Sequence, residues 1–439
     1  MTTTVHEVLE FVRENDVKFI RLAFCDLLGM AKNISIMPDE LPEAFENGIS
    51  FDAHAINGFT DITNSDLFLV PDPTTLSVLP WRPQQGRVVR FYCNIKNPDG
   101  STFWGDSRAI LQSVLRRGEQ MGYSCMVGAE CEFYLFKTDD SGEPTTIPFD
   151  QGGYLDVAPL DKGENVRREI CLCLEEMGIK PEASHHEQGP GQNEIDFKFS
   201  DGLSCADNLV TFKQVVKSIA ARNGLYASFS PKPMPDRSGS GLHINLSLSR
   251  NGFNVFRSSE KKDLREAESF IAGILQKTPE MTAFLNPLPN SYERLGAFEA
   301  PKYVSWSPGN RSQLVRIPVA TGDKMRMELR SPDPATNPYL AFALVINAGL
   351  YGIEHRLPLP DSLNVDLFQA DRSVTDSLER LPDSLEEALK LAEESRFVRD
   401  TLGEKLVERY IQLKRQELQD LSRAANKREH FLEHYFKVI

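Results

Sequence analysis

Three stretches of the chain alternate between polar and apolar residues, the pattern of β-strands that have two different faces. They cover residues 126–136, 241–249 and 325–329. A strand of this kind normally turns its polar face to water, but these faces carry few of the Lys and Thr residues of a solvated surface. We therefore expect them to line a cavity, the default form of a ligand site. The polar positions include Gly128, Glu130, Glu132, Tyr134, His243, Asn245, Ser247, Ser249, Arg326, Glu328 and Arg330.

Helical spacing of apolar residues fills much of the remaining chain. Thr4 and Glu7 form a capping box in front of a helix that we expect to end near Asn15. The longest apolar run, residues 339–353, is too short to span a membrane and predicts a buried helix. Further helices are expected at residues 107–121, 164–177, 206–223, 385–394 and 401–423.

The first hundred residues predict a small unit of sheet and helix. Strand-like runs are separated by turn residues, and the last run ends at the turn Asn97-Pro-Asp-Gly100. We expect a first domain at residues 1–100 and a second at 101–439, in an α+β protein. The predicted strands of the first unit are residues 18–25, 32–37, 77–79 and 87–95.

One stretch, residues 183–197, places two carboxylates at the ends of a Gly-Pro-Gly turn. Because such a turn lets the chain double back, Glu187 and Glu194 can reach a common point. Ile195 and Phe197 alternate with Glu194 and fix its direction on a strand. Two converging carboxylates suit a hard divalent cation; the alternative for this stretch alone is a surface hairpin with solvated acids.

Composition narrows the function classes. The chain has 439 residues, 41% of them hydrophobic, and a net charge of −14. A protein that tracks a nucleic-acid backbone needs a basic face, so nucleic acid is not an expected partner. The seven cysteines include no Cys-x-x-Cys pair, and the first residues lack the basic and apolar regions of a signal peptide. We expect a cytoplasmic protein without a membrane partner.

Five carboxylates and one imidazole stand out as candidate metal ligands. Taken alone, a Glu-x-Glu on a strand is more often a solvated edge, and a single strand histidine is usually structural. Their joint occurrence on alternating strands favours two hard divalent cations with three protein ligands each. The candidates are Glu130, Glu132, Glu187, Glu194, Glu328 and His243.

Five arginines accompany these acids: Arg294, Arg311, Arg316, Arg326 and Arg330. Surface salt bridges are the ordinary alternative for such residues. Two of the arginines, however, flank Glu328 on its own strand face, and arginines combined with metals bind phosphates and carboxylates. This combination indicates phosphoryl transfer from a nucleotide. The chain has no phosphate-binding loop of the GxxxxGK[ST] type, so nucleotide binding would use another fold.

The motifs in their order closely resemble those of the type I glutamine synthetase family. Each segment is moderately specific, but the ordered set is very specific and covers nearly the whole chain. The resemblance rests on GAECEF (128–133), HHEQGPGQNE (185–194), GSGLH (239–243), NPLPNSYER (286–294), NRS (310–312) and RMELRSPDPA (326–335).

This resemblance implies an N-terminal β-grasp domain and a catalytic domain with a curved antiparallel sheet flanked by helices. It also implies two stacked hexameric rings, a dodecamer with active sites between subunits. The activity implied is ATP-dependent ligation of ammonia to the γ-carboxylate of L-glutamate through γ-glutamyl phosphate, part of nitrogen metabolism. ATP, glutamate and ammonium would be the substrates, with two or more Mg²⁺ or Mn²⁺ ions per site.

Residue roles follow from the same resemblance. One metal would be held by Glu132, Glu187 and Glu194, and the other by Glu130, His243 and Glu328. Glutamate would contact Gly239, Arg294, Arg311 and Arg330. ATP would contact Glu182, Phe229, Asn245, Ser247, Arg311, Arg316 and Arg326. Asp52 of a neighbouring subunit, Tyr154 and Glu187 would form the ammonium site, and Asp52, Glu299 and Arg311 would be catalytic.

The chain departs from the family pattern around the expected ammonium site. Where the family has Phe-Asp-Gly-Ser-Ser, residues 51–55 read Phe-Asp-Ala-His-Ala. The segment around Glu299 is one residue shorter than usual. A γ-glutamyl-amine ligase that uses a monoamine or polyamine is therefore the alternative function. A non-catalytic relative is a remote alternative, because all six expected metal ligands are present.

Overall fold

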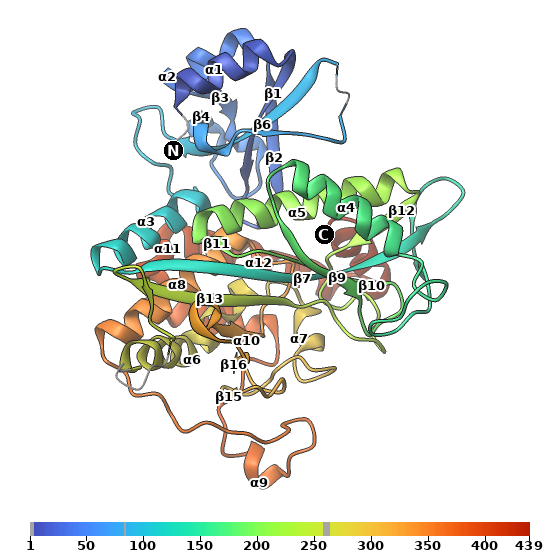
Figure 1. Cartoon of the computed structure of the whole chain (residues 1–439), viewed down its shortest axis with the longest axis vertical. Coiled ribbons are helices and arrows are strands. Elements are labelled where there is room, and N and C mark those ends of the chain that lie inside the picture. The colour runs from blue at the N-terminus through green and yellow to red at the C-terminus, as the bar shows by residue number, and fades with distance from the viewer. Residues whose placement is uncertain (1–3, 83–84, 258–263) are drawn as a thin grey trace.

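The computed structural model describes residues 4–82, 85–257 and 264–439. A small unit of sheet and helix stands above a larger one built on two long strands (Figure 1). Within the described residues, no helix is long and apolar enough to cross a membrane. The two units carry separate sheets, as the sequence led us to expect.

The smaller sheet has six strands in the order β2-β1-β6-β4-β3, with β5 beside β6. Strands β1 and β6 run parallel, while the other pairs are antiparallel. The capping box predicted at Thr4 and Glu7 is present at the start of α1. The elements are α1 Val5–Glu14, β1 Val17–Cys25, β2 Ala31–Ile36, α2 Leu41–Glu46, β3 Ile49–Asp52, β4 Asp66–Pro71, β5 Ser77–Val78 and β6 Arg87–Lys96.

The larger sheet has eleven strands, and its path runs β15-β16-β17-β13-β7-β10-β9. Strands β8, β11 and β12 also pair with β7, and β14 pairs with β13. All of these pairs are antiparallel except β15 with β16. The strands are β7 Ser124–Thr138, β8 Pro144–Pro148, β9 Pro181–His186, β10 Gln192–Phe197, β11 Ser200–Asp201, β12 Leu225–Ser228, β13 Leu242–Arg250, β14 Phe253–Asn254, β15 Trp306–Pro308, β16 Val315–Ile317 and β17 Met327–Leu329.

The alternation seen in the sequence divides the two faces of this sheet. The apolar positions Cys131, Ile195, Ile244 and Leu329 have no exposed surface and belong to the main core. Because successive strand residues point to opposite faces, the acids between them must lie together on the other face. The core therefore fixes the direction of the candidate site residues.

Helices cover the apolar side and fill the rest of the larger unit. Figure 1 shows α3, α4 and α5 between the small sheet and the long strands β7 and β13. The helices are α3 Ser107–Gln120, α4 Glu164–Glu176, α5 Gly202–Arg222, α6 Arg265–Leu285, α7 Ser291–Arg294, α8 Pro338–Glu354, α9 Arg372–Thr375, α10 Leu385–Glu394, α11 Arg396–Leu402, α12 Glu404–Arg423 and α13 Lys427–Phe431.

Helix α8 is the buried helix predicted from the long apolar run. It crosses α6 at a very short distance: a Cβ on Gly273 would lie 2.2 Å from the carbonyl oxygen of Ala348. A Cβ on Gly352 would lie 2.0 Å from the carbonyl oxygen of Ser269. Glycine is therefore needed on both helices for this close packing.

The prediction of one continuous helix at residues 401–423 was wrong. Residues 401–423 read as one helix, but the chain breaks at Gly403, whose φ is 90°. That left-handed conformation ends α11 and allows α12 to begin in a new direction. A glycine inside an otherwise helical pattern is tolerated often enough that the pattern alone did not reveal the break.

Candidate active site

Carboxylates from neighbouring strands face one another directly in the larger sheet. Glu132 on β7 lies opposite Glu194 on β10, and Glu130 lies opposite Asp196. On the other side of β7, Glu130 lies opposite His243. Directly opposite residues bring their Cβ atoms to about 5 Å, and like charges at that distance destabilise a sheet. Such crowding is typical of a site that binds a cation.

These side chains line a cavity of about 610 Å³. Five of the six expected metal ligands contribute to its wall, and Glu328 lies behind them with 1% of its side chain exposed. Tyr154, Glu187 and Glu299 also lie on the wall. Other expected residues on the wall are Gly239, Arg294, Arg311, Arg316, Arg326 and Arg330.

Glu130, His243 and Glu328 form one cluster, in which one ligand atom of each lies within 4.8 Å of the others. His243 Nδ1 is 3.4 Å from Glu130 Oε2 and 3.6 Å from Glu328 Oε1. Burial opposes the ionisation of Glu130, but its contacts with His243 and then Asn245 outweigh burial and lower its pKa to about 2. The cluster therefore offers ionised oxygen ligands and one imidazole nitrogen.

Glu328 is held by cations as well as by the imidazole. Arg316 Nη1 donates to its Oε2 at 2.6 Å, and Arg330 Nη1 donates to its Oε1 at 2.5 Å. Burial opposes its ionisation, yet His243 and then Arg330 lower the pKa of Glu328. A buried carboxylate of this kind is stable only because it is paired.

A second group of acids, Glu132, Glu187 and Glu194, has few cationic partners. Burial and then the charge of Glu132 raise the pKa of Glu187 to about 7. The same two causes raise the pKa of Glu194 well above its usual value. Hydrogen bonds nevertheless orient Glu132, which accepts from Gln192 Nε2 at 2.9 Å and from the Gly241 N–H at 2.8 Å. Oriented carboxylates that repel one another fit a hard divalent cation between them.

The hairpin that carries Glu187 and Glu194 is anchored by the buried side chain of Asp150. Gly191 at its tip has φ 71° and donates its N–H to Asp150 at 2.9 Å. His186 Nε2 contacts the same carboxylate oxygen at 2.9 Å, and the Asp150 side chain is only 1% exposed. The predicted doubling back at the Gly-Pro-Gly turn is confirmed, and a buried ion pair fixes its position.

Two of the arginines on the cavity wall, Arg294 and Arg330, are held by backbone oxygens. Arg294 Nη1 donates to the Ser331 carbonyl at 2.7 Å, and its Nη2 donates to the Arg330 carbonyl at 3.2 Å. Arg330 Nε donates to the Arg311 carbonyl at 3.1 Å. Because their positions are fixed before any ligand arrives, these guanidinium groups can bind an anion with little loss of side-chain freedom.

A second cavity of about 220 Å³ adjoins the first and shares Glu130, Asp196 and Arg326 with it. Arg326 Nε donates to the side-chain oxygen of Asn245 at 2.8 Å. The structure brings four residues expected to contact ATP into this wall: Glu182, Asn245, Ser247 and Arg326. The arginine thus connects the two cavities.

Phe229, which was expected near the adenine of ATP, is buried. Its ring has no exposed surface and packs among core aromatics, with centroids 5.8 Å from Phe133 and 6.0 Å from Phe212. It lines neither of the two cavities, because its neighbours on both sides belong to the core. An exposed aromatic on the second cavity is Phe199, which is 58% exposed. The expected role of Phe229 beside the adenine stays a prediction, and the burial of its ring could not be read from the motif.

Asp52 is not brought to the cavity within this chain. It ends β3 in the smaller unit, is exposed, and accepts the His54 N–H at 3.0 Å. Tyr154, by contrast, stands at the cavity edge with its ring centroid 5.7 Å from that of His185. Of the residues expected to form the ammonium site, Tyr154 and Glu187 therefore line the cavity of a single chain and Asp52 does not.

The wall residues that sequence reasoning missed include Gln188, Gln192 and Asp196. The signal for Asp196 was available, because it alternates with Ile195 and Phe197 and so shares the face of Glu194. Burial and then Glu130 raise its pKa to about 7. The two glutamines gave no such signal, since uncharged side chains in a turn are ordinary.

Comparison with known proteins finds related sequences along nearly the whole chain. Residues 16–98 match the family described as "Glutamine synthetase, beta-Grasp domain", and residues 104–432 match "Glutamine synthetase, catalytic domain". The chain is 49% identical to the glutamine synthetase of Methanosarcina mazei over 420 residues, 94% of each chain. It is 45% identical to that of Clostridium saccharobutylicum, over 95% of each chain.

Solved structures show a similar fold over nearly the whole chain. A structure described as "GmaS/ADP complex-Conformation 1" superposes with a TM-score of 0.87 at 31% identity, covering 98% of this chain and 99% of the other. A Plasmodium falciparum glutamine synthetase superposes with a TM-score of 0.85 at 25% identity, covering 98% of both chains.

Proposed function

The chain belongs to the glutamine synthetase family, and from this we propose how its carboxylate cavity joins ammonia to glutamate. The protein is an ATP-dependent ligase that converts L-glutamate and ammonia to L-glutamine, with ADP and phosphate as the other products. The observation that carries this function is the convergence of paired acids, His243 and anchored arginines on one cavity. Its N-terminal unit is a β-grasp domain, and we place the boundary to the catalytic domain at residues 100–101.

We propose that two divalent cations, Mg²⁺ or Mn²⁺, bind in this cavity. Support comes from the donor set, since hard cations prefer oxygen ligands and accept one imidazole. The crowding of Glu187, Glu194 and Asp196 supports it too, because their raised pKa values reflect acids without a cation. When bound, such ions would neutralise phosphate oxygens during transfer. The ligand sets would be Glu132, Glu187 and Glu194 for one ion, and Glu130, His243 and Glu328 for the other.

For glutamate we propose binding against the anchored arginines. Arg294 and Arg330 are nearly fully buried, so their guanidinium groups would hold the substrate carboxylates strongly. Arg311 lies on the same wall and would reach both glutamate and the transferred phosphate. The Gly239 carbonyl would contact the substrate; this oxygen already accepts from Gln192 Nε2 at 3.1 Å.

For ATP we propose the second cavity together with its shared wall. Glu182, Asn245 and Ser247 would bind the nucleoside, and Phe199 would take the place expected for Phe229 beside the base. Arg311, Arg316 and Arg326 would bind the phosphates. A cavity that is continuous with the acid cluster would direct the terminal phosphate toward the glutamate γ-carboxylate.

The reaction then needs a base that takes a proton from ammonium and a group that excludes water. We propose Asp52 from a neighbouring copy for the first role, because this residue is exposed and distant from the cavity of its own chain. Tyr154 and Glu187 would complete that pocket. Glu299 would close over the reacting carbonyl and protect the acyl phosphate from hydrolysis.

This division of the site implies an oligomer, and we propose a dodecamer of two hexameric rings. The need for Asp52 of a second copy supports an active site between subunits. We also propose a cytoplasmic location, which is supported by seven cysteines without disulfide partners, six of them buried.

The test is an assay of ADP and product with different nucleophiles. The assembled protein is incubated with ATP, glutamate and either ammonium, methylamine, ethanolamine or putrescine. Glutamine formation with ammonium at a catalytic efficiency well above that with the amines is expected. Preference for an amine, with negligible turnover of ammonium, would instead establish the alternative γ-glutamyl-amine ligase.

A further inference from the structure

The segment 294–301, which contains Glu299, passes along one side of the carboxylate cavity. Two consecutive non-glycine residues in it lie in the left-handed region: Phe298 has φ 48° and Glu299 has φ 68°. Residues with a Cβ rarely adopt this backbone conformation, because it is sterically unfavourable. Contacts with the surrounding structure must therefore help to hold the segment where it is.

Two contacts connect this segment to other parts of the chain. Lys232 Nζ lies 4.5 Å from the centroid of the Phe298 ring, a cation–π contact. Gln188 Nε2 donates a hydrogen bond to Glu299 Oε1 at 3.2 Å. The first contact holds the neighbour of Glu299, whereas the second holds the carboxylate itself.

Gln188 lies at the tip of the hairpin, and contacts of the neighbouring residue hold this tip in place. The next residue, Gly189, donates its N–H to the side-chain oxygen of Gln192 at 2.9 Å. A Cβ on Gly189 would lie 2.0 Å from the phenolic oxygen of Tyr134, so the tip packs directly on the sheet. The Glu299 segment is thus tied to an anchored element that also lines the cavity.

Gln188 also stands between two acids of like charge. Its backbone N–H donates to Glu187 Oε2 at 2.9 Å, while its side-chain amide donates to Glu299. Two carboxylates that face one cavity repel each other. The neutral side-chain amide can donate to Glu299 without adding a charge beside Glu187, which neither a carboxylate nor an apolar side chain can do.

We propose that Gln188 is a positioning residue that holds Glu299 over the cavity and so decides how the acyl phosphate divides between ammonia and water. This inference rests on the proposed function. If Glu299 moves away, water adds to the γ-carbonyl carbon and the bond from that carbon to the phosphate oxygen breaks. Glutamate and phosphate are then released, and ATP is consumed without forming glutamine. The ratio of glutamine to ADP therefore reports the position of Glu299.

The experiment compares Gln188→Ala and Gln188→Glu with the wild type, as full-length assembled protein. Glutamine and ADP are measured in the same reaction at saturating ATP, glutamate and ammonium. The wild-type ratio should be close to one. Loss of one exposed hydrogen bond changes an equilibrium by roughly 2- to 10-fold. We expect a severalfold lower ratio for Gln188→Ala and a lower one still for Gln188→Glu, whose added carboxylate repels both acids.

A matched control is Gln416→Ala on α12. Gln416 is likewise an exposed glutamine whose Nε2 donates to a carboxylate, that of Asp420, at 2.9 Å. This control should keep the wild-type ratio. A second measurement uses Glu299→Gln with and without Gln188→Ala. Because Gln188 acts through Glu299, the double variant should show the same ratio as Glu299→Gln alone.

Unchanged glutamine-to-ADP ratios in both Gln188 variants overturn this proposal, even if the overall rate falls. A further fall in the double variant overturns it as well, since Gln188 would then act independently of Glu299. If the wild type itself forms neither glutamine nor ADP, the proposed function fails and this inference fails with it. Melting temperatures of all variants show that the comparison is made between folded proteins.

Discussion

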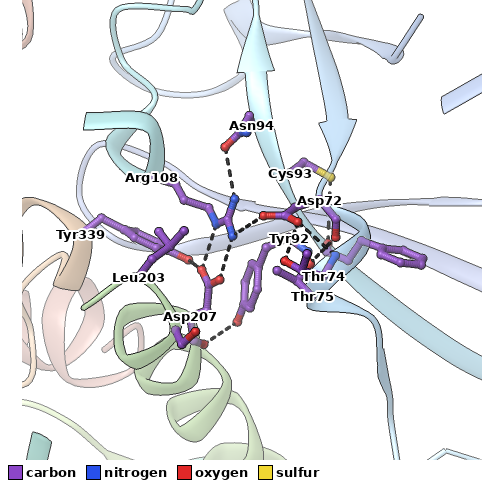
Figure 2. A network of polar contacts seen from close by, with 12 residues as sticks. Asp72, Thr74, Thr75, Tyr92, Cys93, Asn94, Arg108, Leu203, Asp207 and Tyr339 are labelled. Carbon is purple, nitrogen blue, oxygen red and sulfur yellow. Dashed lines mark hydrogen bonds and ion pairs between the residues drawn. The ribbon is translucent and has the colours of Figure 1, made fainter. Parts of the chain in front are cut away.

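Arg108 and Asp207 form a two-pronged ion pair where the two units of the molecule meet. Arg108 Nε and Nη2 donate to the two oxygens of Asp207 at 3.0 and 2.9 Å. Figure 2 shows the rest of the network, in which Arg108 also reaches Asp72 and Asn94 of the smaller unit. Tyr339 on α8 donates to the same Asp207 at 2.7 Å. The network holds the β-grasp domain against the helices that support the active site.

Replacing Arg108 should destabilise this junction strongly. Its side chain is 4% exposed, so Arg108→Ala leaves the buried Asp207 and the half-buried Asp72 without their cation. Removing one partner of a buried pair costs about 3–5 kcal/mol. Chemical denaturation checks this, with the exposed Arg116→Ala on the same helix as the control. Equal stability of the two variants would contradict the role of the network.

Asp150→Asn should loosen the metal-binding hairpin in a pH-dependent way. Contacts with His186 and backbone N–H groups overcome burial and lower the pKa of Asp150 to about 2. Because the pKa of this carboxyl is lower in the folded than in the unfolded chain, the ionised carboxylate stabilises the fold at pH values above the unfolded pKa. That stabilisation is lost as the pH falls toward 2. At neutral pH the variant should be less stable by about 2 kcal/mol, and the gap should close between about pH 4 and pH 2.

His186 adds a second pH dependence to the stability of the fold. Contact with Asp150 outweighs burial and raises the pKa of His186 in the folded chain. The protonated imidazole therefore contributes its full stabilisation at pH values below the pKa of His186 in the unfolded chain. This stabilisation is lost as the pH rises through the pKa that His186 has in the folded chain. Thermal melts of both proteins at several pH values provide the measurement. A gap that stays constant down to pH 2 would refute the assignment to Asp150.

Glu194→Gln should separate folding from metal binding. Burial and Glu132 raise the pKa of Glu194 in the folded chain, so its ionisation opposes folding as pH rises above about 4.5. The metal-free variant should therefore be more stable than metal-free wild type at pH 8. Added Mg²⁺ or Mn²⁺ should stabilise the wild type more than the variant, which keeps the ligands of the second ion, Glu130, His243 and Glu328.

Melting with chelator and with each metal distinguishes these states. Glu268→Gln on α6 replaces an exposed acid outside the cavity and should respond to metal as the wild type does. Equal metal stabilisation of Glu194→Gln and wild type would argue against Glu194 as a ligand. Activity of Glu194→Gln should fall along with metal stabilisation.

Phe199→Ala should weaken ATP binding, whereas Phe229→Ala should destabilise the fold. Phe199 is exposed on the second cavity, and loss of a ring stacked on a base costs about 1–3 kcal/mol. We expect a KM for ATP raised about 10-fold with near-normal stability. Phe229→Ala should instead destabilise the fold by about 3–5 kcal/mol, as for other buried aromatics. Kinetics and denaturation on both variants check this; an unchanged KM in Phe199→Ala would remove this residue from the site.

Mixed oligomers test whether Asp52 acts in a neighbouring subunit. Asp52→Asn and Glu132→Ala should each inactivate the enzyme on their own. In an equal mixture assembled from separated subunits, about one quarter of interfaces would join an intact cavity to an intact Asp52. Recovery of activity near that fraction is expected. No recovery would mean that both residues act in the same chain.

Much of the site could be predicted from sequence because strand alternation is a local property. Glu130, Glu132 and His243 must share a face, since the apolar residues between them are buried on the other. Gly403 shows the limit of local reasoning, because only its observed φ reveals that one predicted helix is two. Phe229 shows another, because a motif gives a residue type and not its exposure.

The sequence by itself determined the directions of the acids, the buried helix α8 and membership of the family, all of which depend on short-range periodicity or ordered motifs. Only the tertiary structure decided which strands are neighbours, and hence that Glu132 faces Glu194 and Glu130 faces Asp196. It also decided that Gln188 reaches Glu299, a contact between residues 111 positions apart. Strand order and loop contacts depend on packing between distant segments, and no local pattern encodes them.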